Sequence, residues 1–259
     1  MKNQWKNKLK TLYIDFLNFL YPHKCLLCGV FIDHEGFCDS CLAHRIQRIK
    51  KPYCKICSEE LNIHNVSNID NLICGNCLSK KYYFDKALSI FKYNEDIATV
   101  IHLFKFRNKF ILSEFLASFL LEKINEFNDK IDYIAPVPIY KKKLQIRGYN
   151  QTVLLTNEFV KHGYTNIIND LLIKSVQTKA QSELNYSDRV KNLTKSFILN
   201  SKYIDTIKGK NILIIDDVFT TGSTANECAR ILKRFKANKV FVLTLAKTTL
   251  NKKDFQQLL

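Results

Sequence analysis

Residues 211–224 read NILIIDDVFTTGST, and this stretch decides the fold of the chain. An apolar run at 212–215 leads into two acids, Asp216 and Asp217, and then into a turn rich in Thr and Gly. Uninterrupted apolar runs are typical of internal strands in parallel sheets, and residues 225–232 continue with the apolar spacing of a helix. The turn is therefore predicted to join the carboxyl end of a strand to the amino end of a helix.

A turn in that position is suited to a phosphorylated sugar. Backbone N–H groups and the positive end of the helix dipole attract an anion, and open α/β sheets bind ligands at the carboxyl ends of their strands. Gly222 allows close approach of the backbone, while the two carboxylates accept hydrogen bonds from a vicinal diol and help to hold hydrated Mg²⁺. The alternative interpretation is a strand, a turn and a helix cap with incidental acids, because Thr and Ser are common capping residues.

The same stretch closely resembles the phosphoribosyl pyrophosphate (PRPP) signature of type I phosphoribosyltransferases, in which paired acids precede a Thr- and Gly-rich loop. The resemblance implies that the acids bind the ribose hydroxyls and that the loop wraps the 5′-phosphate. The PRPP-binding residues that it implies are Asp216, Asp217, Val218, Phe219, Thr220, Thr221, Gly222, Ser223 and Thr224.

The cysteines form a second pattern, because eight of the nine fall into four Cys-x-x-Cys pairs near the amino terminus. Each pair supplies one edge of a tetrahedral zinc site, so four pairs predict two closed four-thiolate sites that are structural and not catalytic. Pairing of neighbours along the chain has the lower loop-closure cost, and interleaved pairing stays open. The predicted zinc ligands are Cys25, Cys28, Cys38, Cys41, Cys54, Cys57, Cys74 and Cys77.

Disulfide bonds and redox chemistry account less well for the cysteine pairs than zinc does. A disulfide framework is disfavoured because the chain is large and carries no export signal, and redox centres use one Cys-x-x-Cys pair and not four. The zinc-stabilised region has three possible functions, which are contact with DNA, binding of a protein, and capping of the neighbouring active site.

The chain as a whole is basic. Its 259 residues include 40 Lys and Arg against 24 Asp and Glu, a net charge of +16, and 46% are hydrophobic, which is enough for a sizeable core. The excess charge favours phosphorylated ligands or nucleic acid, although a biased genome that enriches Lys explains the same total. The densest basic patches are formed by Lys141, Lys142, Lys143 and Arg147 and by Lys105, Arg107 and Lys109.

Between the cysteines and the signature, the sequence predicts alternating strands and helices. Strands are expected at 84–93 and 131–138, and helices at 95–106, 112–127 and 151–162. Two prolines end the second strand and start a loop that carries the basic patch at 141–147. A basic loop there suits the pyrophosphate half of PRPP, because Arg supplies forked donors to phosphate oxygens, and a solvated charged loop is the alternative.

The combined pattern resembles the ComF-like competence proteins, which join N-terminal zinc ribbons to a type I phosphoribosyltransferase fold. The resemblance rests on the cysteine pairs, on PVP at 136–138 followed by RGYNQ at 147–151, on residues 178–192 and on the PRPP signature. It implies an α/β fold with a parallel sheet flanked by helices, preceded by a small N-terminal double zinc-ribbon domain. Lys174 departs from the family pattern, in which Arg often stands ahead of the Thr and Gln.

The resemblance also implies roles for individual residues and cofactors. The implied catalytic residues are Asp216, Asp217 and Arg147. The residues implied to bind pyrophosphate are Val137, Pro138, Arg147, Gly148, Asn150 and Lys105. A hood loop at 175–195 is implied to close over PRPP through Thr178, Lys179, Gln181 and Arg189, and an ordinary helix with exposed charges is the alternative. The implied cofactors are two structural Zn²⁺ ions and Mg²⁺ bound with PRPP.

The domain boundaries follow from these patterns. Residues 5–21 carry basic residues and an apolar run interrupted by Asp15 and Asn18, which predicts an amphipathic helix and neither a signal peptide nor a membrane span. We expect this helix at 1–22, the double zinc-ribbon domain at 23–80, the phosphoribosyltransferase-like domain at 81–250 and a tail at 251–259. The expected location is the cytoplasm, without a transmembrane segment.

Two functional hypotheses remain. The first is a Mg²⁺-dependent phosphoribosyltransferase with a role in natural transformation, which displaces pyrophosphate from PRPP with a nitrogen nucleophile on an acceptor that the sequence does not identify. The second is a non-catalytic component of the DNA-uptake machinery that senses PRPP, binds single-stranded DNA and has other competence proteins as partners. Release of pyrophosphate with a defined acceptor distinguishes the two.

Overall fold

The computed structural model describes residues 23–34, 36–63, 69–106, 112–175 and 196–248. The chain divides into two compact units, residues 1–47 and 48–259, so the second set of cysteines shares a unit with the predicted phosphoribosyltransferase-like domain. The expected domain boundaries at 22, 80 and 250 stay a prediction. The expected N-terminal helix, the tail and the hood residues lie outside the described residues; those hood residues are Thr178, Lys179, Gln181 and Arg189.

The first unit is built from a short hairpin and one helix. Strand β1 (His23–Lys24) pairs antiparallel with β2 (Phe31–Ile32), and α2 (Asp39–His44) follows. The Arg45 guanidinium donates a hydrogen bond to the Leu27 carbonyl at 3.1 Å, which joins the end of the helix to the hairpin turn.

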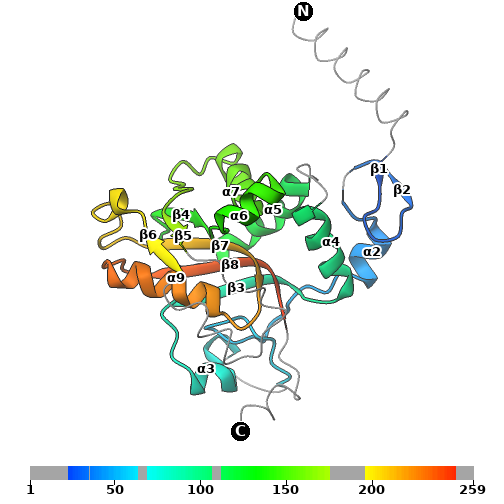
Figure 1. Ribbon diagram of the computed structural model, residues 1–259. Helices are drawn as coiled ribbons and strands as arrows, with labels where there is room; N and C mark the ends of the chain where they lie inside the picture. The colour runs from blue at the N-terminus through cyan, green and yellow to red at the C-terminus, as the bar shows by residue number, and fades with distance from the viewer. Residues whose placement is uncertain (1–22, 35, 64–68, 107–111, 176–195, 249–259) are drawn as a thin grey trace, which may run out of the picture. The chain divides into compact units, whose positions relative to one another are not determined.

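The second unit contains a four-stranded sheet in which every neighbouring pair is parallel. In spatial order the strands are β3 (Lys86–Lys92), β8 (Val240–Lys247), β7 (Ile212–Phe219) and β4 (Tyr133–Pro136). The apolar run at 212–215 lies in an inner strand and is fully buried, as expected for a strand covered on both faces. The predicted parallel α/β sheet is therefore confirmed (Figure 1).

Helices cover both faces of this sheet. Figure 1 shows α5 and α7 on one side and α9 on the other. The main helical elements are α4 (Glu95–Phe106), α5 (Leu112–Lys123), the 3₁₀ turn η2 (Ile124–Glu126), α7 (Gln151–Lys161) and α9 (Ser223–Arg234). The predicted helices at 95–106, 112–127 and 151–162 are confirmed, because local apolar periodicity and the final packing favour the same conformation.

Two local predictions need correction. Residues 141–147 form helix α6 (Lys141–Arg147) and not a loop; Gly148, in the left-handed conformation with φ 79°, ends it. Lys, Leu, Gln and Arg are good helix formers, so local propensity is sufficient here. Strand β7 also continues through the two acids, because Asp216 pairs with Thr244 and Val218 with Ala246 of β8.

Smaller elements complete the second unit. They are η1 (Ile69–Asn71), α3 (Gly75–Ser79), an antiparallel pair of β5 (Leu172–Lys174) and β6 (Phe197–Leu199), and η4 (Ser201–Tyr203). Among the described residues, none of the helices has the length and apolar character that a bilayer crossing requires.

Candidate functional site

Two cysteine clusters join pairs that neighbour each other along the chain. The sulfur atoms of Cys25, Cys28, Cys38 and Cys41 lie within 4.8 Å of one another, and so do those of Cys54, Cys57, Cys74 and Cys77. The Sγ–Sγ distances are 3.6 Å for Cys28 and Cys38 and 3.7 Å for Cys57 and Cys74. These distances match the edge of about 3.8 Å that zinc–sulfur bonds of about 2.3 Å produce in a tetrahedron. The chain therefore has two four-thiolate zinc-binding sites with sequential pairing, and the interleaved alternative is wrong.

The two sites use the same turn after their second cysteine. Gly29 has φ 75°, and its N–H donates to the Cys25 carbonyl at 2.9 Å. Ser58 occupies the corresponding place with φ 54°, and its N–H donates to the Cys54 carbonyl at 2.8 Å. Glycine adopts this left-handed conformation without steric cost, whereas serine does not. Ser58 is therefore a strained residue. It was not predicted from the sequence, because such turns were expected only at glycines.

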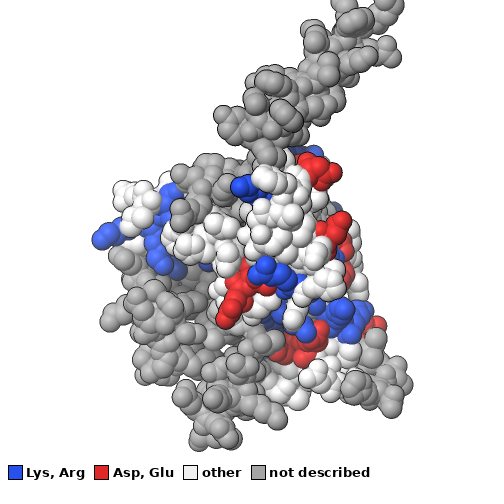
Figure 2. All heavy atoms as spheres, turned by 90° about the vertical axis from the view of Figure 1, so that its right-hand side faces the viewer, with Lys and Arg blue, Asp and Glu red and all other residues white. Residues whose placement is uncertain are grey.

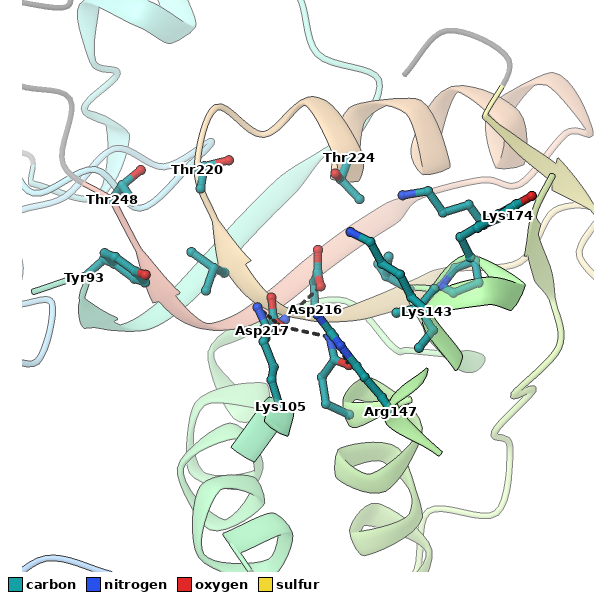
Figure 3. A pocket seen from close by; sticks show the side chains of 16 residues that line it. Tyr93, Lys105, Lys143, Arg147, Lys174, Asp216, Asp217, Thr220, Thr224 and Thr248 are labelled. Atoms are coloured by element: carbon teal, nitrogen blue, oxygen red, sulfur yellow. Dashed lines mark hydrogen bonds and ion pairs between the residues drawn. The ribbon is translucent and has the colours of Figure 1, made fainter. Parts of the chain in front are cut away.

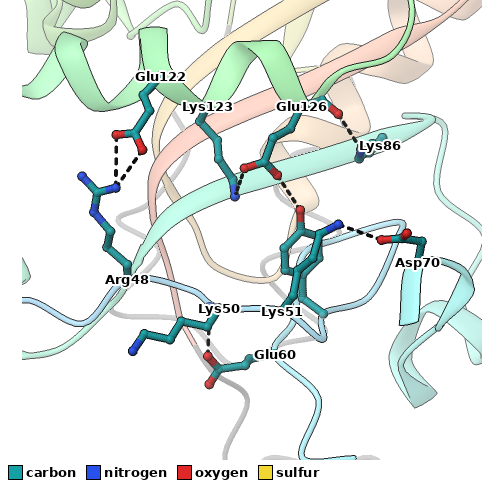
Figure 4. Close-up of polar contacts among 10 residues, drawn as sticks. Arg48, Lys50, Lys51, Glu60, Asp70, Lys86, Glu122, Lys123 and Glu126 are labelled. Atoms are coloured by element: carbon teal, nitrogen blue, oxygen red, sulfur yellow. Dashed lines mark hydrogen bonds and ion pairs between the residues drawn. The ribbon is translucent and has the colours of Figure 1, made fainter. Parts of the chain in front are cut away.

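The second zinc site is anchored to the sheet-bearing body of its unit by residues that precede and include Tyr53. The Tyr53 hydroxyl donates to Glu126 Oε2 at 2.6 Å. Arg48 donates to both carboxylate oxygens of Glu122 at 3.0 and 3.1 Å (Figure 4). The four cysteines of this site also belong to the hydrophobic core that contains Phe219 of β7. This zinc site and the sheet therefore share one core.

A cavity of about 400 Å³ opens at the carboxyl ends of β4 and β7 (Figure 3). Its wall combines the two acids of β7 with cations from three other elements, Lys105 of α4, Lys143 and Arg147 of α6, and Lys174 of β5. Cavities of this size bind small molecules, and this arrangement of charge suits a ligand that carries both hydroxyls and phosphates.

The two acids have opposite electrostatic environments. Lys105 Nζ lies 2.7 Å from Asp217 Oδ2, and Gln151 Nε2 donates to the same oxygen at 3.0 Å. Burial opposes ionisation of Asp217, but the adjacent ammonium outweighs it and lowers the pKa of that carboxyl. For Asp216, burial and then the charge of Asp217 raise the pKa from 3.8 to about 7. Near neutral pH the site therefore holds one ionised carboxylate and one that is close to its titration midpoint.

The RGYNQ string at 147–151 holds the acid pair in place. Arg147 donates to Gln151 Oε1 at 3.1 Å, and Gln151 in turn donates to Asp217. The buried Tyr149 hydroxyl donates to the Phe104 carbonyl at 2.5 Å, at the end of α4. These contacts connect α4, α6 and β7 around the cavity.

Asn150, in the same string, begins helix α7. Its side chain accepts a hydrogen bond from the Thr152 N–H at 3.2 Å and donates to the Val137 carbonyl at 3.1 Å. Asn150 is therefore a helix cap that fixes α7 to the segment after β4.

Cations occupy the side of the cavity opposite Lys105. In Figure 3 the side chains of Lys143 and Lys174 point into the cavity toward the side where Asp216 and Thr224 lie. Burial and then the charge of Lys143 lower the pKa of Lys174. An anion placed between these two lysines relieves their repulsion, so this side of the cavity favours a phosphate group.

The turn between β7 and α9 is tightly closed. Gly222 has φ 74°, and a Cβ atom at this position would lie 2.5 Å from the Phe219 ring. The Thr221 and Ser223 hydroxyls lie 2.7 Å apart, and the hollow inside the turn measures about 10 Å³. Such a hollow holds about one water molecule and no phosphate, whereas Thr220 and Thr224 also line the cavity of about 400 Å³, so that side of the turn is the one with room for a ligand.

Comparison with known proteins identifies the chain. The family descriptions "Double zinc ribbon domain" and "Phosphoribosyl transferase domain" match residues 16–78 and 169–254. Competence protein F of Haemophilus influenzae is 30% identical over 242 residues, which cover 90% of this chain and 99% of that protein. The chain belongs to the ComF family of competence proteins.

More relatives of this ComF-family chain match over similar lengths. DNA utilization protein YhgH of Escherichia coli K12 is 27% identical over 234 residues, which cover 88% of this chain and 98% of that protein. Competence protein ComFC of Bacillus subtilis 168 is 26% identical over 216 residues, which cover 83% of this chain and 85% of that protein. The similarity to these relatives therefore extends over both the zinc ribbons and the sheet-bearing part of the chain.

The structure of this ComF-family chain gathers many of the predicted site residues at the cavity. Those that line it are Lys105, Val137, Pro138, Arg147, Asp216, Asp217, Val218, Thr220 and Thr224. Phe219, Gly222 and Ser223 line only the small hollow of the turn. Thr221 contacts Ser223, while Gly148 and Asn150 are cap residues of α6 and α7. The roles assigned to all of these residues in ligand binding stay predictions.

Several residues at the cavity had no assigned role in the ComF-type site. They are Tyr93, Ile139, Tyr140, Gln151, Lys174 and Thr248, whereas Lys143, which also lines the cavity, belongs to the basic patch expected to suit the pyrophosphate. Gln151 stood in the RGYNQ string and Lys143 in the basic patch, so the sequence carried a signal for both. Tyr93 and Thr248 directly follow β3 and β8, and the rule that ligands bind at the carboxyl ends of parallel strands is the signal that points to them.

Proposed function

We propose that this chain binds PRPP in the cavity at the carboxyl ends of β4 and β7 and transfers its phosphoribosyl group. The observation that supports this most is that an acid pair, a hydroxyl-rich turn and a group of cations border one cavity of about 400 Å³. PRPP carries a ribose diol, a 5′-phosphate and a pyrophosphate. Carboxylates accept from hydroxyls, whereas N–H donors and cations bind phosphates, so each wall matches one part of the ligand.

The ribose is assigned to the acid pair. Asp216 accepts hydrogen bonds from the diol, because Lys105 and Gln151 already occupy one oxygen of Asp217. The turn at 220–224 binds the 5′-phosphate on the side where Thr220 and Thr224 line the cavity.

The pyrophosphate is assigned to the cations that face the acid pair. Lys143, Arg147 and Lys174 line this part of the cavity, and Arg147 supplies the forked donors that phosphate oxygens accept. The half-buried position of these side chains strengthens their attraction for an anion relative to that of fully solvated lysines.

The proposed reaction is a displacement at the anomeric carbon. A nitrogen nucleophile forms the new C–N bond as the C–O bond to pyrophosphate breaks, and the leaving group keeps the electron pair. The acid pair offsets the positive charge that develops on the ribose ring, and the cations offset the charge of the leaving group. Asp216 suits Mg²⁺, which prefers carboxylate and phosphate oxygens and, when bound, neutralises charge on the leaving group.

We further propose that this activity serves natural transformation. The proposal comes from the relatives, which are named competence proteins and DNA utilization proteins and match nearly the whole length of the chain. The acceptor of the phosphoribosyl group stays open.

The test of the site is PRPP binding by Asp216→Asn combined with Asp217→Asn, measured by calorimetry on the full chain. We expect binding to be lost while two zinc ions per chain are retained. Asp205→Asn, which neutralises a carboxylate that is 91% exposed, is the matched control and should bind normally. Unchanged affinity in the double variant would refute the site.

A second candidate function is sensing of PRPP without catalysis, coupled to binding of single-stranded DNA. It is favoured by one observation, which is that the described residues lining the cavity include no carboxylate besides the acid pair to activate an acceptor. Pyrophosphate release in the presence of bases, amines or oligonucleotides would favour transfer, and PRPP binding without release would favour sensing.

The DNA arm of this second candidate is tested at the basic patch. Lys141 and Lys142 are exposed on α6, and where Figure 2 shows acidic side chains, at its centre and right, basic side chains lie next to them. Reversing the charge of Lys141, Lys142 and Lys143 should weaken single-strand binding and flatten its dependence on salt. The same change at Lys130, Lys208 and Lys210, which precede the amino ends of β4 and β7, away from the carboxyl ends where the cavity opens, is the control for net charge.

A further inference from the structure

A buried lysine lies between the second zinc site and the turn that follows β7. Lys247, the last residue of β8, is 4% exposed, and its Nζ lies 3.2 Å from Glu59 Oε2. The same ammonium lies 4.3 Å from the centre of the Phe219 ring. A buried charge is costly unless a counter-charge is held next to it; Glu59 supplies the nearest carboxylate, and the charge of Lys247 also acts on Cys57 of the zinc site.

Glu59 is in turn held by the zinc site. It follows Cys57 by two residues, and its carbonyl accepts a hydrogen bond from the Cys54 N–H at 2.8 Å. Four-thiolate turns of this kind fold around their metal, because the ligands have no fixed arrangement without it. The carboxylate opposite Lys247 is therefore in place only while the Cys54–Cys57 turn is ordered.

On its other side, Lys247 supports the residue that shapes the turn. The Phe219 ring fills the space beneath Gly222, and the Phe219 carbonyl accepts from the Thr248 N–H at 3.0 Å. Phe219 is also packed edge-on against Phe84, with ring centres 5.9 Å apart. Loss of order at Lys247 therefore removes the cationic contact of the Phe219 ring and loosens the backbone pairing beside it.

We propose that Lys247 is a positioning residue through which the second zinc site sets the conformation of the turn at 219–224. Zinc at Cys54, Cys57, Cys74 and Cys77 then controls how well this turn binds a phosphate, and zinc in the first unit does not. The identity of the ligand rests on the proposed function, whereas the ordering of the turn does not.

The direct test is hydrogen exchange of the amides at 218–226 in the zinc-loaded full chain without ligand. Glu59→Gln removes the carboxylate beside Lys247 and leaves the buried ammonium facing only the Cys57 side of the zinc site, so we expect exchange there to become about tenfold faster or more. Glu60→Gln is the matched control, because Glu60 pairs with Lys92 and not with Lys247. Equal exchange in the two variants would overturn the proposal.

A double-mutant cycle isolates the role of the lysine. In a Lys247→Met background the Glu59→Gln effect should disappear, because no buried ammonium then needs the carboxylate. An undiminished effect in that background would overturn the role of Lys247. If the Glu59→Gln variant loses zinc, Glu59→Asp takes its place in the same cycle. The shorter aspartate side chain keeps the negative charge but moves it away from the Lys247 Nζ.

The zinc dependence has its own comparison within the chain. Cys28→Ser disables the first site and should leave exchange at 218–226 unchanged, whereas Cys57→Ser should accelerate it. Faster exchange in both cysteine variants, or in neither, would overturn the dependence on the second zinc site. If Cys57→Ser unfolds the whole unit, the Glu59 double-mutant cycle decides the question. Calorimetry with PRPP on the same variants separates this proposal from the proposed function. A chain that does not bind PRPP still shows, by hydrogen exchange, whether the second zinc site orders the turn.

Discussion

The Lys105 ammonium lies 2.7 Å from the Asp217 carboxylate, across the space between α4 and the end of β7. Both groups are largely buried, with side-chain exposures of 23% and 9%. The pair leaves Asp216 without a cation at this distance among the described contacts, and the two adjacent acids therefore titrate in different ranges. This asymmetry gives the site one carboxylate that stays ionised near neutral pH and one whose charge changes with pH in that range.

Replacement of Lys105 should destabilise the chain by leaving the buried Asp217 carboxylate without its ammonium partner. We expect Lys105→Met to lower the free energy of unfolding by about 3 kcal/mol in urea denaturation at neutral pH. Lys130→Met is the control, because Lys130 is 87% exposed and lies 3.9 Å from its partner Asp132. Equal stability of the two variants would show that the buried pair contributes nothing.

The raised pKa of Asp216 predicts a particular dependence of stability on pH. Between 3.8, the ordinary value, and about 7, the folded chain binds a proton on Asp216 that the unfolded chain has lost. The contribution of this residue to the free energy of unfolding therefore falls as pH rises through that window and is constant above it. The Asp216→Asn variant has no carboxyl to titrate at this position. Its free energy of unfolding relative to that of the unaltered chain should therefore increase from about pH 5 to about pH 8 in urea titrations. A constant difference would contradict the raised pKa.

Gly222 should tolerate no side chain, for two separable reasons. It has φ 74°, and an added Cβ would meet the Phe219 ring at 2.5 Å. Gly209 has φ 68° with nothing within 4 Å, so Gly209→Ala measures the backbone cost alone, about 1 kcal/mol. We expect Gly222→Ala to cost about 1 to 3 kcal/mol more than Gly209→Ala in denaturation experiments. Equal costs would mean that the ring moves aside freely.

The strained serine of the second zinc turn predicts a stabilising change. Ser58 has φ 54°, and its buried hydroxyl has no hydrogen-bond partner among the described residues. Ser58→Gly should raise the free energy of unfolding of its unit by about 1 kcal/mol, because it removes both costs. The reciprocal change, Gly29→Ser, should weaken zinc retention at the first site in competition with a chelator. A destabilising Ser58→Gly would show that the hydroxyl has a role in the folded state.

Much of the sheet and of the helices could be predicted because their signals are local. The apolar run at 212–215 and the periodicity of 95–106 each specify one element without knowledge of the rest of the chain. Helix α6 was missed because its lysines were interpreted only through their charge, although their helix propensity favours the observed conformation.

The sequence by itself determined the parallel α/β sheet, the acidic strand end with its turn, and the eight zinc ligands, since each depends on residue types at fixed spacings. Only the tertiary structure decided which cysteines share a site, which acid pairs with Lys105, and that Lys247 lies between Glu59 and Phe219. The contacts of Lys105 with Asp217 and of Lys247 with Glu59 join segments far apart in the chain, where they depend on how strands and helices pack and leave no periodic signal in the sequence.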